Sequence, residues 1–482
     1  MEALQNIVDT INTYLSDYIL IVLLIGAGVL FTIKTHFVQI RCFGEGIRDV
    51  FGKFTMSGGK HGGGLSSFQA LATAVAAQVG TGNIVGACGA ILTGGPGAIF
   101  WMWVIAFFGM ATIYAEAVLA QETKQVAADG SVKGGPVYYI KRAFSGKFGT
   151  FLAVFFAVSI TIALGFIGTM VQANSITEAI ENIIDPERSN ILISLGSVNI
   201  TVTAAIAGAV IAVISGIIFI GGAQRIASVT EKLVPIMAVI YLVGGLVIIF
   251  ARIKYVPETF GMIFKYAFQP NAIIGGGIGM ALKTAISQGA KRGLFSNEAG
   301  MGSTPHAHAL AKVKTPHEQG VVAMIGVFID TFVVLTMTAL VVISTLYAGD
   351  GVLASGSADG VMNTNMAQLA FGKIFGADIG SIFVAVCLLF FAFSTILGWN
   401  LFGKINFEYL FGKKAVVVYS VLAVVFIFIG SCLRNDLVWA LMDMFNNLMV
   451  LPNVIALTAL SGAVAVSAKK GIAAYKNRNN GK

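Results

Sequence analysis

The sequence has few charged residues and few of the side chains that carry enzyme chemistry. Only 11% of its 482 residues are charged, and it holds four cysteines and five histidines. A soluble domain carries about 25% charged residues, so a soluble enzyme, a secreted scaffold and a nucleic-acid-binding domain are excluded. The cysteines lie far apart without C-x-x-C spacing, so they indicate neither a disulfide framework nor a zinc site; they are Cys42, Cys88, Cys387 and Cys432.

Apolar residues fill most of the chain instead. They make up 56% of it, and glycine is abundant at 57 residues. A helix needs about 20 mostly apolar residues to cross the hydrocarbon core of a bilayer. We therefore predict an all-α, polytopic membrane protein with about eleven transmembrane helices. The predicted spans are residues 17–34, 66–92, 95–121, 148–172, 200–221, 233–251, 272–303, 320–346, 378–401, 415–432 and 438–467.

The positive charges are concentrated in alternate loops. The net charge is +8, and most lysines and arginines outside the spans lie in 34–60, 124–147, 225–232, 312–314, 404–414 and 469–478. The intervening loops carry few, apart from 252–265. Because basic loops remain on the cytoplasmic side of a membrane, we predict an outside N-terminus and a cytoplasmic C-terminus. The net positive charge is then explained by basic loops on the cytoplasmic side of the lipid bilayer, and we predict no nucleic-acid partner.

The spans after the first divide into two groups of five with opposite topology. Inverted repeats of this kind are typical of secondary transporters, whose site lies near the membrane midplane between the repeats. We predict four regions: an extra N-terminal helix and loop (1–60), a first repeat (61–252), a second repeat (253–468) and a basic cytoplasmic tail (469–482). Residues 253–268 are amphipathic and form either an interfacial helix or the start of the seventh span.

Polar residues interrupt the second span. Between apolar stretches it carries Gln78-Val79-Gly80-Thr81-Gly82-Asn83. Each glycine weakens a helix by about 1 kcal/mol relative to alanine, and amide side chains are costly in lipid unless they face a cavity or a partner. The pattern predicts a broken helix whose free N–H groups bind a carboxylate and whose carbonyls coordinate sodium. Close helix packing through small residues is the alternative.

The seventh span should correspond to the second one. It contains Gly275, Gly276, Gly277 and Gly279, so we predict a second interruption there. Paired interruptions at corresponding positions of two halves indicate a transporter binding site. The following segment, 291–308, is too polar for a lipid-facing helix, and we expect it to form the inner mouth of the protein.

The ninth span carries two adjacent hydroxyls, Ser394 and Thr395, within an apolar run. Such hydroxyls often bond back to a carbonyl of their own helix. If they face the second span, they are oxygen ligands of the kind that a hard cation prefers. The sequence leaves both interpretations open.

Four stretches of the chain resemble the sodium:alanine symporters, also called the alanine/glycine:cation symporter family. They are 94–109 (GGPGAIFWMWVIAFFG), 78–86 (QVGTGNIVG), 292–303 (RGLFSNEAGMGS) and 391–399 (FAFSTILGW), and the resemblance extends over residues 60–460. His306 departs from the small or apolar residue expected in relatives. The 94–109 stretch is the specific one, since a G-T-G-N run alone is a weak signal.

The resemblance implies a fold and an activity. The fold is LeuT-like, of the amino acid-polyamine-cation superfamily, with a five-plus-five inverted repeat and one extra N-terminal helix. The activity is symport of alanine, glycine or both with sodium into the cell by alternating access, by a monomer in the plasma membrane of a bacterium or archaeon. No cofactor is implied apart from the transported sodium ion. A proton-coupled carrier of the same fold is the alternative.

The resemblance also implies site residues. Sodium would be held by two backbone carbonyls and two hydroxyls, those of Ala76, Val79, Ser394 and Thr395. The substrate would lie at the two interruptions, against Gln78, Gly80, Thr81, Gly82 and Asn83 of the first and Gly275, Gly276 and Gly277 of the second. Asn83 matches a second sodium ligand in the neurotransmitter:sodium symporters. The last three glycines would offer carbonyls to the ammonium group.

Other ionisable residues stay ambiguous. Glu116, Asp330 and Asp443 are either functional carboxylates, as intramembrane acids usually are, or ties between helices. A proton carrier would depend on Asp330. His306 and His308 form an H-x-H pair, which we expect to be solvated at the cytoplasmic end rather than to bind a metal. A channel is disfavoured because no charged ring or carbonyl-filter motif recurs, and an enzyme because no nucleophile–base pair or H-E-x-x-H motif is present.

Overall fold

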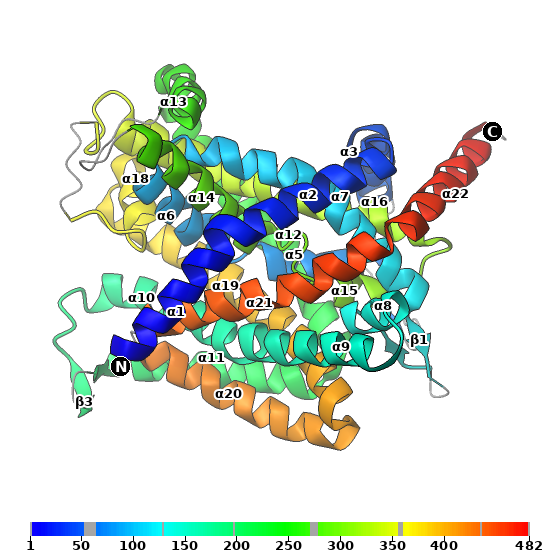
Figure 1. Cartoon of the computed structure of the whole chain (residues 1–482). Coiled ribbons are helices and arrows are strands. Elements are labelled where there is room, and N and C mark those ends of the chain that lie inside the picture. Colours follow the sequence, from blue (N-terminus) through cyan, green and yellow to red (C-terminus); the bar gives the residue numbers. More distant parts are fainter. Residues whose placement is uncertain are drawn as a thin grey trace.

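The protein is a bundle of helices that run mostly along one direction (Figure 1). The computed structural model describes residues 2–52, 64–127, 130–195, 198–269, 278–354, 360–433 and 436–480. Within these residues, eight helices are long and apolar enough to cross a membrane, and a bent pair raises the number to nine. The predicted all-α, polytopic membrane fold is therefore confirmed.

The long helices agree with the predicted spans but extend further at several ends. They are α7 (Ala98–Thr123); α9 (Gly146–Ile160), η3 (Thr161–Gly168) and α10 (Thr169–Ile184) in one run; α11 (Val202–Ile220); α12 (Gly222–Ala251); α16 (Pro316–Val327), η5 (Phe328–Leu335), α17 (Thr336–Val342) and η6 (Ile343–Tyr347) in one run; α19 (Ala377–Phe411); η7 (Lys413–Ala415) with α20 (Val416–Cys432); and α21 (Asp436–Ala459). Three elements of these runs, η3, η5 and η6, are π-helical.

The remaining elements are shorter or broken. The predicted first span is the end of a longer run, α1 (Glu2–Tyr14), η1 (Leu15–Ile19) and α2 (Leu20–Lys34). The second and seventh predicted spans are α5 (Ser67–Gln78), η2 (Gly82–Gly86) and α6 (Ala87–Gly94), and α14 (Ile278–Asn297) with α15 (Pro305–Leu310). The connecting helices are α3 (Val38–Arg41), α4 (Phe43–Phe51), α8 (Pro136–Ala143), η4 (Ile253–Tyr255), α13 (Val256–Phe268), α18 (Met366–Phe375) and the C-terminal α22 (Ser461–Asn480).

Two small antiparallel hairpins complete the described chain. Strands β1 (Gln125–Val126) and β2 (Val132–Lys133) pair at one end of the bundle, and β3 (Ile191–Leu195) and β4 (Val198–Thr201) pair at the other.

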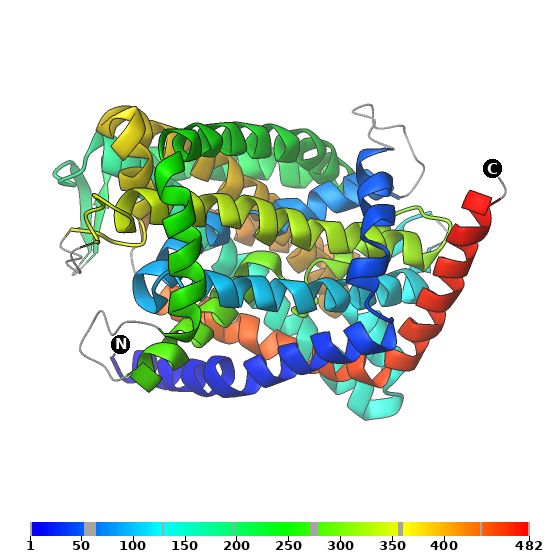
Figure 2. The same cartoon turned by 90° about the horizontal axis from the view of Figure 1, so that it is seen from above.

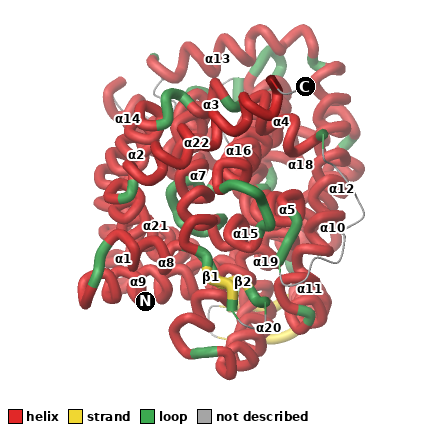
Figure 3. Tube along the Cα trace, turned by 90° about the vertical axis from the view of Figure 1, so that its right-hand side faces the viewer, coloured by secondary structure: helices red, strands yellow, loops and turns green. Residues whose placement is uncertain are grey.

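Burial distinguishes central from peripheral helices. In the view along the bundle, α5, α7 and α15 lie inside, whereas α11, α12 and α20 lie toward the periphery (Figure 3). In its most apolar stretch α7 is 67% buried, whereas α12 is 28% buried. The outer face of α11 exposes Ile206, Val210 and Ile217. Apolar side chains on an outward face are expected where lipid replaces water as the solvent.

The two ends of the bundle carry different segments. The N-terminus, the β3–β4 hairpin and α18 lie at one end, and α3, α8 and the C-terminus lie at the other (Figure 1). The basic segments 34–60 and 124–147 contain α3 and α8, so the described parts of these helices belong to the second end. Opposite ends for the termini agree with an odd number of spans.

The amphipathic segment 253–268 is a separate helix. Figure 2 shows α13 crossing the direction of the long helices. Its apolar face packs on α7: Trp101 Nε1 donates to the Ala267 carbonyl at 3.0 Å, and the rings of Phe100 and Phe264 lie 5.8 Å apart. Of the two predicted possibilities, the structure has the helix that lies across the bundle end.

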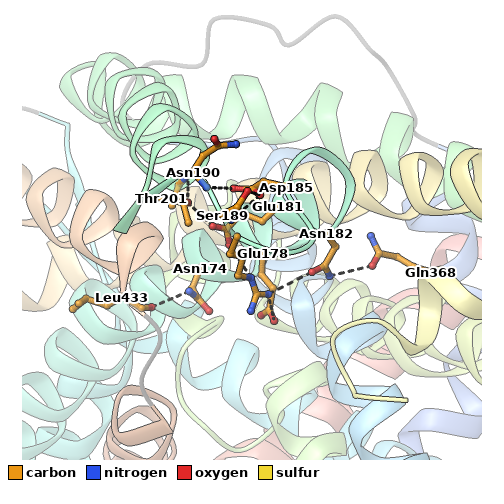
Figure 4. Close-up of polar contacts among 12 residues, drawn as sticks. Asn174, Glu178, Glu181, Asn182, Asp185, Ser189, Asn190, Thr201, Gln368 and Leu433 are labelled. Atoms are coloured by element: carbon orange, nitrogen blue, oxygen red, sulfur yellow. Dashed lines mark hydrogen bonds and ion pairs between the residues drawn. The ribbon is translucent and has the colours of Figure 1, made fainter. Parts of the chain in front are cut away.

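Polar contacts join the segments at the N-terminal end of the bundle (Figure 4). Asn182 Nδ2 at the end of α10 donates to Gln368 Oε1 of α18 at 3.3 Å, and Asn174 Nδ2 donates to the Leu433 carbonyl at 2.9 Å.

An ion-pair cluster lies at the same end. Asp350 contacts Arg252 at 2.7 Å and Lys373 at 3.1 Å, so it connects the end of α12 to α18. Hydrogen bonds from Arg252 and then Lys373 lower the pKa of the Asp350 carboxyl to about 2.

Candidate functional site

The second predicted span is broken where the sequence predicts it. Ser66 begins α5 with a capping box shared with Gln69, and the helix ends at Gln78. Val79 leaves helical geometry with φ −81° and ψ 87°. The backbone is helical again at Thr81, just before η2 begins at Gly82, and the two halves are bent by 48°. Val79 and Gly80 therefore interrupt the helix, as the prediction requires.

The break faces the middle of α19. Thr395 Oγ1 donates to the Ala76 carbonyl at 2.9 Å, and Ser394 Oγ lies 3.3 Å from the same oxygen. Both hydroxyls also reach the Phe391 carbonyl of their own helix, at 2.8 Å for Ser394 and 3.1 Å for Thr395. The hydroxyl pair thus bonds to its own helix and also faces the second predicted span, and the structure brings Ala76, Ser394 and Thr395 together beside the break.

The predicted substrate residues surround the same break. Gln78 Nε2 donates to the Asn297 carbonyl at 2.7 Å, and the Thr81 N–H donates to Gln172 Oε1 at 3.3 Å. The Gly80 N–H donates to Asn83 Oδ1 at 3.0 Å, so a side chain of the break bonds to the backbone of the same break. Two buried polar atoms here, Gln78 Oε1 and Thr81 Oγ1, have no hydrogen-bond partner among the described residues.

A second break lies in the predicted seventh span, at a different place from the prediction. Gly275, Gly276 and Gly277 lie outside the described residues, so the interruption predicted there stays a prediction. The described break follows Asn297: residues Glu298, Gly300 and Gly302 have φ of 56°, 88° and 81°, and α15 begins only at Pro305. A left-handed φ at three alternate positions ends the α-helix, and the two glycines adopt it without steric cost.

The two broken helices lie side by side. Leu65, just before α5, pairs with Ala311, just after α15. The Leu65 N–H donates to the Leu310 carbonyl at 2.9 Å, and the Lys312 N–H donates to the Leu65 carbonyl at 2.9 Å. The half-helix that enters the first break therefore lies beside the half-helix that leaves the second. Such pairing of broken helices at a repeat interface is typical of secondary transporters.

The sequence pattern of the sodium:alanine symporter family matches residues 1–481. The chain belongs to this family. It is 39% identical over 466 residues to the sodium/alanine symporter AgcS of Methanococcus maripaludis, and the alignment covers 96% of each chain. It is also 36% identical over 453 residues to the amino-acid carrier protein AlsT of Bacillus subtilis, covering 92% of this chain and 88% of that one.

A solved structure agrees on the fold. The crystal structure of MhsT in complex with L-phenylalanine superposes with a TM-score of 0.57 over 85% of this chain and 99% of that chain, at 13% identity. At this identity the likeness concerns the fold alone, which is LeuT-like as the resemblance implies. The family is a transporter family and not an enzyme family.

Two buried carboxyl side chains form hydrogen bonds that stabilise the second break. Glu116 of α7 accepts the Gly300 N–H at 3.1 Å, the Gly302 N–H at 2.9 Å and Asn453 Nδ2 at 2.7 Å. Glu298 accepts the Ser303 hydroxyl at 2.6 Å and the Trp399 indole N–H. Of the two roles that the sequence leaves open for Glu116, its contacts are those of a tie between elements.

A third buried carboxylate joins both breaks. Asp330 accepts Asn83 Nδ2 at 2.7 Å and the Thr331 hydroxyl at 2.8 Å. Ser296 Oγ lies 3.1 and 3.0 Å from its two oxygens. Asn83 belongs to the first break and Ser296 lies just before the second, so Asp330 connects the two.

The segment 291–308 is not a solvated mouth. Residues 293–308 are buried, and His306 and His308 are exposed by only 0% and 1%. His306 Nε2 lies 2.8 Å from Asn406 Nδ2, and His308 Nδ1 lies 2.8 Å from Gln319 Nε2. The expectation of cytoplasmic solvation is wrong for both histidines, because partners from α19 and α16 replace water around them.

The sequence interpretation missed several residues of the site. Gln172, Ser296, Asn297 and Glu298 all contact the two breaks. A signal for three of them was present, since Gly300-Met301-Gly302 repeats the G-x-G pattern of Gly80-Thr81-Gly82 beside polar residues. No comparable signal surrounds Gln172, whose α10 helix approaches the break only in the folded protein.

Proposed function

We propose that the protein carries alanine into the cell together with sodium, and that glycine is a second substrate. Membership of the sodium:alanine symporter family and the similarity to AgcS support alanine and sodium. The observation that carries the proposal is the meeting of the Ser394 and Thr395 hydroxyls with the Ala76 carbonyl at a broken helix. Helix breaks supply backbone groups for ions and small charged substrates, which suits this cargo.

The sodium ion is assigned to the carbonyls of Ala76 and Val79 and the hydroxyls of Ser394 and Thr395. All four residues are buried, with exposures of at most 1%. Carbonyl and hydroxyl oxygens are the ligands that a hard cation prefers. When sodium binds, the hydroxyl lone pairs turn to the ion while their protons keep the Phe391 carbonyl as acceptor.

The substrate is assigned to the first break and its surroundings. The backbone N–H groups of Gly80–Gly82 suit the carboxylate, which would replace Asn83 Oδ1 and Gln172 Oε1 as the acceptor of the first two. The buried Gln78 Oε1 and Thr81 Oγ1 suit donors such as the ammonium group. An unpaired buried polar atom costs about 1–3 kcal/mol, so a bound zwitterion removes this cost. The carbonyls of Gly275, Gly276 and Gly277 remain the predicted further partners of the ammonium group.

Close packing around the first break supports the proposal of a substrate with a small side chain. A Cβ at Gly82 would lie 3.1 Å from a ring carbon of Phe295 and 3.2 Å from the Ser296 Cα. A Cβ at Gly80 would overlap the Thr395 hydroxyl. The walls beside the break are therefore closely packed, which suits a substrate with a side chain as small as that of alanine or glycine.

The placement in the cell follows from the charges of the loops. We assign the end with α3, α8 and the C-terminus to the cytoplasm and the end with the N-terminus to the outside of the plasma membrane, by the positive-inside rule. The repeats are assigned to 61–252 and 253–468, because a broken helix is the first long helix of the first repeat and follows the short helix α13 in the second. We expect the monomer to be the transporting unit, since one chain holds both breaks.

Uptake of labelled alanine into proteoliposomes tests this function. We expect uptake to require an inward sodium gradient, to persist with a proton ionophore present, and to be competed by unlabelled glycine. Uptake that is unaffected by removal of sodium would overturn the proposal.

A proton-coupled carrier of the same fold is the second candidate. The observation that favours it is the buried Asp330 carboxylate, which connects Asn83 to Ser296 between the two breaks. Asp330→Asn distinguishes the two functions. It would abolish uptake driven by a proton gradient in the second candidate, whereas sodium-driven uptake should retain its dependence on the sodium gradient.

A further inference from the structure

Three side chains that commonly bind transition metals meet at the end of the bundle that holds α4. Cys42 directly precedes α4, Glu45 lies in its first turn, and His317 is the second residue of α16. Their ligand atoms all lie within 4.8 Å of one another. All three residues are buried, at 3%, 6% and 1% exposure. The sequence spacing gives no hint of this group, because His317 lies far along the chain from Cys42.

The spacing fits a shared metal ion better than a direct hydrogen bond. His317 Nε2 lies 3.4 Å from Glu45 Oε2. An N–H···O hydrogen bond is normally about 2.7–3.2 Å long, so this contact is long for one. Two ligands about 2.0–2.1 Å from a tetrahedral zinc ion lie about 3.3 Å apart, which is close to the observed distance.

The other nitrogen of His317 is already oriented. The Tyr114 hydroxyl of α7 lies 2.6 Å from His317 Nδ1. Histidines that bind a metal through one nitrogen almost always hydrogen-bond through the other, which fixes the ring and its tautomer. The C-terminal helix α22 covers the ring, since a Cβ at Gly471 would overlap His317.

The charges of the group are also suitable. A thiolate and a carboxylate together carry two negative charges, and a neutral imidazole adds none. A divalent cation therefore yields an uncharged complex, which is the form that a buried site tolerates. Sulfur and imidazole ligands select zinc and similar transition metals over magnesium or calcium.

We propose that Cys42, Glu45 and His317 bind a zinc ion, with a water molecule as the fourth ligand. The ion fastens α4 to α16, and through Tyr114 to α7. The C-terminal helix is held against the same place, because Arg48 of α4 contacts the Tyr475 hydroxyl. The site is separate from the sodium and substrate residues, and the inference is independent of the transport function.

Cobalt absorption on the tag-free, full-length protein in detergent tests the ligand set. Added Co²⁺ should produce a thiolate-to-cobalt charge-transfer band in the near ultraviolet, at one cobalt per chain. Cys42→Ser should remove the band, and Cys432→Ser, which changes a buried cysteine outside the group, should retain it. The absence of the band in the wild-type protein, or its persistence in Cys42→Ser, would overturn the proposal.

A thermal measurement tests the other two ligands. Zinc that binds only the folded protein raises its unfolding temperature. We expect this rise in the wild type and in His36→Gln, which changes an exposed histidine, and its loss in His317→Gln and Glu45→Gln. An equal rise in all four proteins would show that zinc binds elsewhere, and the proposal would fail.

Discussion

Glycines allow the backbones of α5 and α19 to approach each other at the proposed sodium site. A Cβ at Gly398 would lie 2.9 Å from the Ala77 Cβ, and one at Gly80 would overlap Thr395 Oγ1. Real Cβ atoms do not approach this closely, so larger residues would separate the two helices. The hydroxyls of Ser394 and Thr395 reach the Ala76 carbonyl only because the helices are this close.

Gly80→Val should abolish alanine binding while the protein still inserts and folds. The valine side chain displaces Thr395 and distorts the peptide groups that we assign to the substrate carboxylate. Scintillation proximity binding of labelled alanine to purified protein measures this loss. Gly26→Val is the control, because nothing lies within 4 Å of a Cβ at Gly26. Normal binding by Gly80→Val would show that the substrate lies elsewhere.

Among single residues, the sequence could predict those whose role depends on their immediate neighbours in the chain. The polar and glycine residues 78–83 lie at a helix break, and the two adjacent hydroxyls of α19 face it. The roles of Glu116 and Asp330 could not be decided, since a carboxylate in an apolar run looks the same with or without partners. Their partners come from distant helices, and only the fold shows them.

Among the elements, the second broken helix shows where the sequence interpretation fails. A run of three glycines draws attention to 275–277, whereas the described break is at 298–304. The polar residues of 291–308 predict contact with water, but they are satisfied by other buried groups. Glu116 accepts two N–H groups of the break, and Trp399 donates to Glu298. Burial of a polar segment depends on such partners, which local polarity does not reveal.

Glu116→Ala should destabilise the protein strongly. The substitution leaves the Gly300 and Gly302 N–H groups and Asn453 without their shared acceptor, at about 1–3 kcal/mol for each buried unpaired group. Glu116→Gln, which keeps one acceptor oxygen, should lie between Ala and the wild type. Thermal unfolding, monitored by size-exclusion chromatography, measures the unfolding midpoints of the wild type and the two variants.

The control for this prediction lies on the same helix. Glu122 of α7 forms an exposed ion pair with Arg142 at 2.9 Å. Exposed ion pairs contribute about 0–1 kcal/mol, so Glu122→Ala should change the midpoint little. Equal unfolding midpoints for Glu116→Ala and the wild type would contradict the view that Glu116 stabilises the second break.

Over the whole molecule, the end that holds the N-terminus and α18 is stabilised by the ion pairs of Asp350. Its lowered pKa of about 2 means that the folded protein favours the ionised carboxylate over the protonated carboxyl group. Such a group contributes stability above the ordinary aspartate pKa of about 3.9, and the contribution is lost as the pH falls from there through 2. Because Asp350 is more than half exposed, we expect a small effect that salt weakens further.

Asp350→Asn should therefore lower the unfolding midpoint slightly and by a constant amount between pH 8 and about 5, above the aspartate titration. The difference from the wild type should narrow as the pH falls below about 4. Asp378→Asn, at the start of α19, is the control for a generic loss of charge. A difference that grows toward acid pH would contradict the assigned ion pairs.

At the scale of the whole molecule, the proposed sites make sodium binding and alanine binding depend on each other. Sodium and alanine are assigned to adjacent groups of one broken helix, so binding of each should favour binding of the other by the same factor. The fold class, the first break and the hydroxyl pair could be predicted from the sequence. The pairing of the two broken helices depends on contacts between distant segments, such as Leu65 with Ala311, and could not be.

The most direct test of this account is the affinity of purified protein for alanine, measured by titration calorimetry over a series of sodium concentrations. We predict that saturating sodium tightens alanine binding at least ~10-fold in the wild type, within the usual range of coupling between two sites. The double variant Ser394→Ala and Thr395→Ala should lose most of this gain. An alanine affinity that does not depend on sodium, or a double variant with the full wild-type gain, would contradict the account.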